Sequence, residues 1–235
     1  MKPIFPRFHH LPLAMLSLCM AMSAAAQNRT PAIGTGSGTL PPAHLPGAPD
    51  FAGVEPSPDA EAVASWVLSV ADHNQLPFAI VDKRAARVFV FDGRGRLRGD
   101  APVLLGLAVG DEDVPGIGSL PLSQITPEMR ITPAGRFRAQ IGRNLKGEDI
   151  LWVDYDSALS LHRVATGNPR EARQQRLDSA TVDDNRISFG CINVPARFFD
   201  EVVRSQFAGT NGTVYILPET RPASELFGPQ AQIAR

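Results

Sequence analysis

Short apolar segments separated by polar turns dominate the middle of the chain, and this pattern is typical of strands. Two of them, residues 78–81 and 87–91, flank a short polar turn and predict a β-hairpin. Further strands are predicted over residues 103–109, 150–155, 158–164 and 213–217. The tendency towards hairpins favours a mainly β fold, a sandwich or barrel, over repeated βαβ units.

Two helices accompany these strands. The first begins after Ser57, an N-cap residue followed by Pro58, and apolar residues at helical spacing extend it to about His73. The second covers residues 195–207 and has an apolar face. Residues 110–128 are interrupted by Gly and Pro and predict a long loop.

The two ends of the chain differ from this domain. Residues 1–26 are typical of a secretory signal, because Lys2 and Arg7 precede an apolar stretch and three alanines follow it. The next residues are rich in Pro and Gly and cannot form a core of their own. The predicted organisation is a signal peptide (1–26), a tether (27–57), an N-terminal helix (58–75), a strand-rich domain (76–218) and a loose tail (219–235).

Charge and cysteine content exclude several classes of protein. A formal charge of −1 argues against a nucleic-acid binder, which needs clustered positive charge. Two cysteines cannot build a disulfide scaffold, and removal of the signal takes Cys19 away and leaves Cys191 alone. The bulky Leu18 before Cys19 argues against lipidation, and no transmembrane segment is predicted after signal cleavage.

The strand-rich domain contains one histidine, His162, and one cysteine, Cys191. A zinc site would need two more ligands, and no close ligand spacing is visible. An imidazole beside a thiol can instead take its proton and form a nucleophilic thiolate. Gly190 permits a close backbone approach, so the N–H groups of Gly190 and Cys191 can point at an oxyanion. A buried, inert cysteine stays open as the alternative on these residues alone.

The sequence around this cysteine resembles the signature of the L,D-transpeptidase (YkuD) family of cell-wall enzymes. The motif reads Ser188-Phe189-Gly190-Cys191-Ile192-Asn193, with His162 upstream. Residues 132–137, Thr-Pro-Ala-Gly-Arg-Phe, are similar to a segment that precedes the active site in many members. The resemblance covers roughly residues 76–218 and implies an L,D-transpeptidase catalytic domain there, with a β-sandwich of mixed sheets and no metal or organic cofactor.

The resemblance also implies a reaction. Cys191 would attack diaminopimelate in a peptidoglycan tetrapeptide stem, release D-Ala and pass the acyl group to an amine. That amine would belong to another stem peptide, a D-amino acid or an envelope protein, in the periplasm or cell envelope. Carried over by position, His162 is the base, Gly190 and Cys191 form the oxyanion hole, and Ser188 and Asn193 support the site.

Two departures from the family pattern stand out. Phe189 occupies a position where many members have His. The stretch between His162 and the cysteine motif is also longer than usual, and residues 166–184 form a polar, charged segment with Arg170, Arg173 and Arg176. This segment is expected to be a surface insertion or a lid near the pocket, with a purely decorative loop as the alternative.

Other functions stay open. A YkuD-type hydrolase or amidase would pass the same acyl group to water, and a non-catalytic wall-binding module would keep Cys191 buried and unreactive. Papain-like and NlpC-type peptidases place Cys before His in the chain, and the order here is the reverse. Sortases share the order but usually have a later catalytic Arg and a Thr-rich motif before the Cys.

Overall fold

A computed structural model describes residues 48–228 of the chain. The predicted signal peptide lies outside the described residues, as do the first part of the predicted tether and residues 229–235 of the predicted tail.

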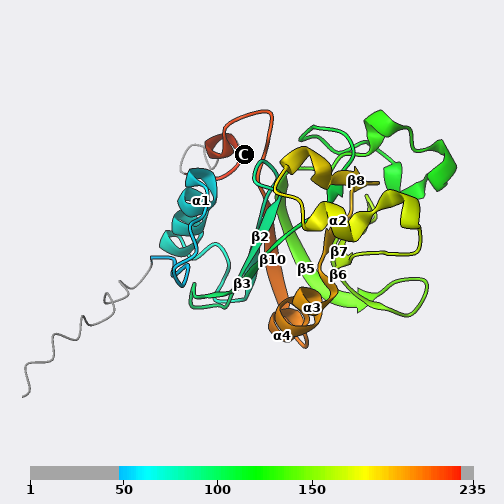
Figure 1. The fold of residues 1–235 in the computed structure, drawn as a ribbon. Coiled ribbons are helices and arrows are strands. Elements are labelled where there is room, and N and C mark those ends of the chain that lie inside the picture. Colours follow the sequence, from blue (N-terminus) through cyan, green and yellow to red (C-terminus); the bar gives the residue numbers. More distant parts are fainter. Residues whose placement is uncertain (1–47, 229–235) are drawn as a thin grey trace, which may run out of the picture. The chain divides into compact units, whose positions relative to one another are not determined.

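Eight strands form one mixed sheet, which confirms the mainly β fold (Figure 1). In hydrogen-bonded order they are β3 (Leu97–Pro102), β2 (Arg87–Phe91), β1 (Phe78–Asp82), β10 (Asn211–Ile216), β5 (Gly135–Arg143), β6 (Asp149–Asp154), β7 (Leu159–Arg163) and β9 (Ile192–Val194). The β1–β10 and β7–β9 pairs are parallel, and the others are antiparallel. The predicted hairpin of β1 and β2 is confirmed, and β6, β7 and β10 form close to their predicted bounds.

The sheet nearly closes on itself, because the chain just after β3 reaches β9 at the opposite edge. Leu104 and Asn193 exchange two main-chain hydrogen bonds there, with N···O distances of 2.8 and 2.9 Å. Beside this contact, β4 (Leu105–Gly106) pairs in parallel with β8 (Arg186–Ser188) as a second, two-stranded sheet. The expected mixed-sheet architecture is therefore realised as one nearly closed sheet with a small sheet at the junction.

The large sheet buries apolar side chains on both of its faces. In β1, Ala79 and Val81 belong to the main core, whereas Phe78 and Ile80 belong to a second core under α1 (Pro58–Ser69). A strand covered on both faces has an uninterrupted apolar sequence rather than an alternating one. This burial on both faces explains why the apolar run at residues 78–81 predicted β1 correctly.

The two predicted helices form, with one change of length. The Ser57 hydroxyl accepts a hydrogen bond from the Ala60 N–H at 3.1 Å, so α1 begins as predicted. It ends at Ser69 rather than near His73, because Ala71 adopts a left-handed conformation with φ of 53°. The second helix is a continuous run of α3 (Ala196–Phe198), a π-helical turn (Phe199–Val203) and α4 (Arg204–Phe207).

The other helical segments are short. The predicted loop over residues 110–128 contains 3₁₀ turns at Ile117–Ser119, Leu122–Gln124 and Pro127–Met129. The insertion between β7 and β8 contains 3₁₀ turns at Pro169–Glu171 and Val182–Asn185 and the helix α2 (Arg173–Leu177). The loop is drawn in green and the insertion in yellow in Figure 1. One further 3₁₀ turn, Ala223–Glu225, follows β10.

Two strands differ from prediction. The strand predicted over residues 103–109 is wrong, because only β4 of this stretch is a strand and the more polar β3 pairs with β2 instead. An ion pair between Arg87 and Asp100 joins these two strands. The apolar pattern misses β5, whose side chains, such as Arg136, are largely polar. Main-chain hydrogen bonds to β10 and β6 hold this strand on both sides whatever its side chains.

Segments next to both ends of the described chain pack onto the second core. Phe51, in the predicted tether, makes edge-on contacts with the rings of Phe89 and Phe91. Ala223 and Phe227, in the predicted tail, are buried. Residues 219–228, expected to be loose, instead help to cover the sheet.

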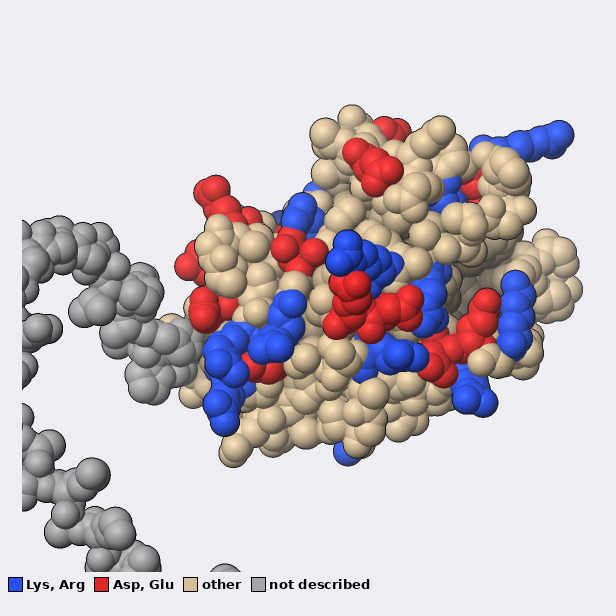
Figure 2. All heavy atoms as spheres, turned by 60° about the horizontal axis from the view of Figure 1, so that its bottom comes forward, with Lys and Arg blue, Asp and Glu red and all other residues tan. Residues whose placement is uncertain are grey.

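Among the described residues, no helix combines the length and the apolar character needed to cross a membrane. On the face shown in Figure 2, Lys and Arg side chains are interspersed with Asp and Glu. This face therefore carries both signs of charge side by side.

Candidate active site

The pairing of β7 with β9 brings the predicted catalytic residues together. The two strands are parallel, and His162 lies opposite Asn193. Leu161 and Ile192 point into the main core, so the alternation of side chains puts His162 and Asn193 on the other face of the sheet. Cys191 directly precedes β9 at this face.

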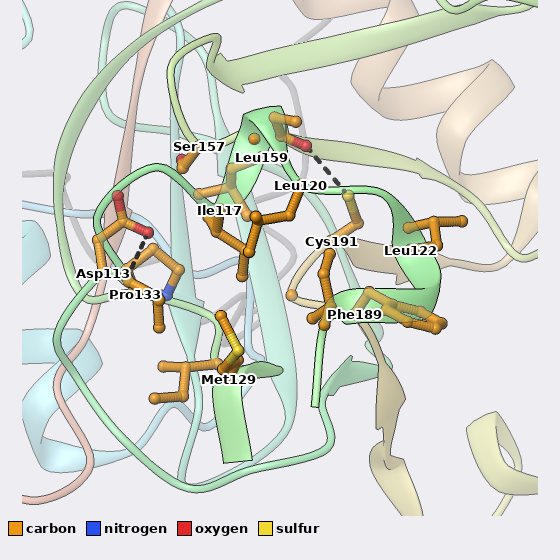
Figure 3. Close-up of a pocket in the computed structure, with 16 residues that line it drawn as sticks. Asp113, Ile117, Leu120, Leu122, Met129, Pro133, Ser157, Leu159, Phe189 and Cys191 are labelled. Carbon is orange, nitrogen blue, oxygen red and sulfur yellow. Dashed lines mark hydrogen bonds between the residues drawn. The ribbon is translucent and has the colours of Figure 1, made fainter. Parts of the chain in front are cut away.

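The Cys191 thiol also has polar neighbours on and beside β7. Its Sγ lies 3.5 Å from Ser160 Oγ and 3.5 Å from the carbonyl oxygen of Ala158, the contact dashed in Figure 3. Cys191 is a free cysteine and is partly exposed. The thiol therefore belongs to a partly exposed residue and has hydrogen-bonding groups beside it.

The pair shifts both pKa values towards a thiolate and an imidazolium. Burial raises the pKa of the Cys191 thiol, but the hydrogen bond and charge of His162, with help from Ser160, lower it below its ordinary value. Burial lowers the pKa of His162, but the hydrogen bond and charge of Cys191 and the Arg163 carbonyl raise it above its ordinary value. These opposite shifts favour an ion pair between the two side chains.

One contact fixes which ring nitrogen takes part. His162 Nδ1 lies 2.7 Å from the carbonyl oxygen of Arg163. Because a carbonyl only accepts, Nδ1 carries a hydrogen and donates it. The proton exchanged with the thiol therefore sits on Nε2.

Ser188 fixes the turn before Cys191. The Gly190 N–H donates to Ser188 Oγ at 3.1 Å, and the Ser188 hydroxyl donates to the Cys191 carbonyl oxygen at 2.7 Å. Gly190 has φ of +128°, and a Cβ there would lie 2.8 Å from the Ile131 carbonyl oxygen. Only glycine fits this position. The N–H of Gly190, predicted as an oxyanion donor, is engaged inside the turn.

Thr132 ties this turn to the neighbouring loop. Its side chain is fully buried, donates to the Gly190 carbonyl oxygen at 2.7 Å and accepts from the Gly106 N–H at 2.8 Å. The main-chain carbonyl of Thr132 accepts from Lys83 Nζ at 2.9 Å. Thr132 thus connects the cysteine turn with β4 and with a buried lysine.

Lys83 belongs to a buried cluster of charges. Its Nζ lies 2.8 Å from Asp111 and 3.4 Å from Glu219, and Glu219 also pairs with Arg186 of β8. Opposite charges that are buried together compensate one another. The cluster holds the segments around residues 110 and 132, on which the turn rests.

The insertion reaches the site through Arg173. An Nη of Arg173 lies 2.6 Å from Asn193 Oδ1, and Arg173 also pairs with Glu171. The Asn193 amide nitrogen lies 3.2 Å from the Cys191 carbonyl oxygen and 3.5 Å from His162 Nε2. Asn193 therefore lies close to both the cysteine turn and His162.

Two hollows adjoin the Cys191–His162 pair. One, of about 150 Å³, is lined by Cys191 and by apolar side chains of the loop, including Ile117 and Met129 (Figure 3). The other, of about 540 Å³, is lined by His162, Ser160 and residues of the β5–β6 hairpin. Phe189 lines the first hollow, and the Arg130 guanidinium lies 3.9 Å from its ring centre.

Ser160 and the contact of Arg173 with Asn193 were not predicted from the sequence. Ser160 stands two residues before His162 on a predicted strand, so alternation alone could have placed it on the same face. No sequence signal joins Arg173 to Asn193. Within residues 48–228, no three His, Cys, Asp or Glu side chains gather as a metal site would need.

No protein-family model and no curated protein sequence matches the chain. Similar solved structures include the helical cell shape determining protein Pgp2 from Campylobacter jejuni, with 14% identity, a TM-score of 0.41 and coverage of 72% of this chain and 58% of that one. The catalytic domain of an E. faecium L,D-transpeptidase shares 18% identity, with a TM-score of 0.36 and coverage of 61% and 98%. An L,D-transpeptidase from Mycobacterium smegmatis shares 12%, with a TM-score of 0.33 and coverage of 60% and 58%.

The chain spans about three fifths of the length of the Campylobacter and Mycobacterium proteins. All three TM-scores lie below 0.5 and all three identities below 25%.

Proposed function

We propose that the chain is an exported L,D-transpeptidase that forms a cysteine acyl-enzyme with peptidoglycan tetrapeptide stems. The observation that carries the proposal is the Cys191–His162 pair, in which the pKa of the thiol is lowered and that of the imidazole is raised. The residue motif around Cys191, with His162 before it in the chain, supports the substrate class.

The first half-reaction uses both members of the pair. The Cys191 thiolate attacks the carbonyl at the L-centre of diaminopimelate, and a carbon–sulfur bond forms. The negative charge that develops on the carbonyl oxygen needs N–H donors, for which we propose the Cys191 amide. The bond to D-Ala then breaks, and His162 Nε2 protonates the departing amine.

The second half-reaction reverses these roles. An acceptor amine attacks the thioester, and His162 Nε2 takes the proton that the amine loses. A new amide bond forms, the carbon–sulfur bond breaks, and Cys191 returns as the thiolate beside the imidazolium. The hollows lined by Cys191 and by His162 give the donor and the acceptor separate approaches to the pair.

Intact-mass analysis with a carbapenem, a suicide acyl donor for this family, tests the acyl-enzyme. We expect one adduct on the wild-type protein and none on Cys191→Ala. An equal adduct on Cys191→Ala, or no adduct on the wild type, would overturn the proposal. A non-catalytic wall-binding module predicts no adduct on the wild-type protein, together with a Cys191 that mild thiol reagents do not label.

Purified sacculi distinguish transfer to an amine from transfer to water. We expect muropeptide profiling by mass spectrometry to show more cross-links, or D-Ala exchanged for an added D-amino acid. A fall in cross-links or bare tripeptide stems as the main product would instead identify a YkuD-type hydrolase. The same digest, repeated with Cys191→Ala, is the control for contaminating wall enzymes.

The proposed location follows from residues 1–26 alone. We expect the protein isolated from cells to begin at Gln27 and to fractionate with the periplasm. Intact mass of the purified protein measures this directly, and a full-length cytoplasmic product would contradict export.

A further inference from the structure

Arg173 lies in the insertion, yet only 11% of its side chain is exposed. One of its terminal nitrogens donates to Asn193 Oδ1 at 2.6 Å, and Glu171 balances its charge. An arginine that is nearly buried and has two fixed partners loses much side-chain freedom, so its contact with Asn193 is specific rather than incidental.

This contact fixes the orientation of the Asn193 amide. A guanidinium has donors only, so the Asn193 atom that faces Arg173 has to be the oxygen. The amide NH₂ group then faces the Cys191 carbonyl oxygen at 3.2 Å and His162 Nε2 at 3.5 Å. Asn193 is 1% exposed, so water cannot replace these partners.

A turned amide would have a chemical consequence. It would place Oδ1, an acceptor, beside His162 Nε2, where it would compete with the Cys191 thiolate for the Nε2–H hydrogen. The positive charge of Arg173 has a separate and opposite effect on His162, since a nearby cation disfavours the imidazolium.

We propose that Arg173 is a positioning residue for the reactive pair. By holding the Asn193 oxygen, it keeps His162 Nε2 directed at the Cys191 thiol. This inference rests on the proposed function only in that it needs a reactive Cys191. It makes the insertion a part of the active site, in place of a decorative loop.

The electrostatic surroundings of His162 are mixed. The groups that face it or line the adjoining hollow come from the cysteine turn, the insertion, β7 and the β5–β6 hairpin. They are Cys191, Arg173, Glu171, Arg163, Lys146, Glu148 and Asp149. Arg173 is the charged side chain of this set that hydrogen-bonds to Asn193, so its replacement changes both the charge near His162 and the orientation of the Asn193 amide.

The insertion offers a matched control. Arg176 is on the same helix, and it donates to the carbonyl oxygens of Glu171 and Asp184, both at 2.9 Å. Arg176→Met therefore weakens the insertion without removing the contact to Asn193. A change that appears with Arg173→Met and not with Arg176→Met is due to that contact.

The experiment is the pH dependence of Cys191 alkylation by iodoacetamide, followed by intact mass. We expect Arg173→Met to move the onset of alkylation to higher pH by about 0.5 to 1 unit, which is about two- to fivefold slower alkylation at the wild-type midpoint. Arg176→Met should follow the wild type. Arg173→Gln, which keeps a donor but no charge, should show a smaller shift in the same direction.

Two results would overturn the inference. One is an Arg173→Met profile that superposes on the wild type, and the other is an equal shift in Arg176→Met, which would indicate a structural effect. If Arg173→Met does not fold, as judged by circular dichroism, Arg173→Gln decides in its place. The assay needs no wall substrate, so a protein with this shift but no muropeptide product refutes the transpeptidase proposal alone.

Discussion

The hydroxyl of Thr132 donates a hydrogen bond to the carbonyl oxygen of Gly190 over 2.7 Å, in a fully buried position. Because the peptide bond is planar and trans, the Gly190 carbonyl and the Cys191 N–H point in opposite directions. Thr132 thus sets the direction of the Cys191 N–H, the group proposed to bind the oxyanion.

Thr132→Val should slow acylation but leave the pH dependence of Cys191 alkylation unchanged. The change keeps the size of the side chain but leaves the Gly190 carbonyl and the Gly106 N–H without their partner. We expect carbapenem acylation to slow about ten- to hundredfold, because a misdirected oxyanion donor loses much of its effect. The free energy of unfolding should fall by about 1–3 kcal/mol. Time-resolved intact mass and urea unfolding measure the two effects.

The control is Thr132→Ser, which keeps the hydroxyl and should retain most of the acylation rate. The pH profile of iodoacetamide alkylation should be unchanged in both variants, since His162 is untouched. If Thr132→Val acylates at the wild-type rate, the direction of the Cys191 amide does not matter for the reaction.

The pair predicts a bell-shaped pH dependence of acylation. The lowered pKa of Cys191 supplies thiolate on the acid side, and the raised pKa of His162 keeps the proton donor on the basic side. His162→Gln should return the thiol towards its ordinary pKa of about 8.5, so alkylation near pH 6 should fall at least about tenfold. A His162→Gln profile equal to that of the wild type would show that the imidazole does not activate the thiol.

Gly190→Ala should distort the turn before Cys191 and slow acylation. Its φ of +128° is unfavourable for alanine, and the added Cβ would lie 2.8 Å from the Ile131 carbonyl oxygen. We expect carbapenem acylation to fall by more than about tenfold, because a displacement of about 1 Å at a reacting group is costly. Gly209→Ala is the control, since Gly209 also has a positive φ but no atom near its Cβ position. Equal acylation rates in the two variants would contradict the need for a close approach.

Asp111 should make stability depend on pH. Burial raises the pKa of its carboxyl, but hydrogen bonds from Lys83, Thr220 and Glu219 lower it well below its ordinary value. Its contribution is therefore fully present above the unfolded pKa of about 3.9 and is lost as the pH falls through the lower folded pKa. Urea unfolding from pH 7 to pH 2 measures this loss.

Asp111→Asn should reduce the free energy of unfolding by about 3 kcal/mol at pH 7, since Lys83 then loses the nearer of its two buried carboxylate partners. The variant should also lose less stability on acidification than the wild type. Glu201→Gln removes an exposed partner of Arg197 and should change stability by less than about 1 kcal/mol. Parallel acid profiles for wild type and Asp111→Asn would show that this carboxyl is not the group responsible.

Strands that bury apolar side chains were predictable, and strands held mainly by main-chain pairing were not. The apolar segments that became β1, β2, β6, β7 and β10 fold near their predicted positions. The polar strands β5 and β3 were not predicted from the apolar segments, although β5 lies between two other strands of the sheet. Ladder hydrogen bonds join backbone groups that every residue carries, so they leave little trace in the side-chain sequence.

The sequence by itself determined the mainly β fold and the two residues on which the proposed chemistry depends, because His162 and Cys191 are the single residues of their types in the strand-rich domain. Only the tertiary structure decided their neighbours. The β7–β9 register, the Thr132–Gly190 contact and the reach of Arg173 to Asn193 join residues far apart in the chain. Such contacts depend on how strands and loops that are distant in the sequence pack together. The local pattern of apolar and polar residues carries no information on this packing.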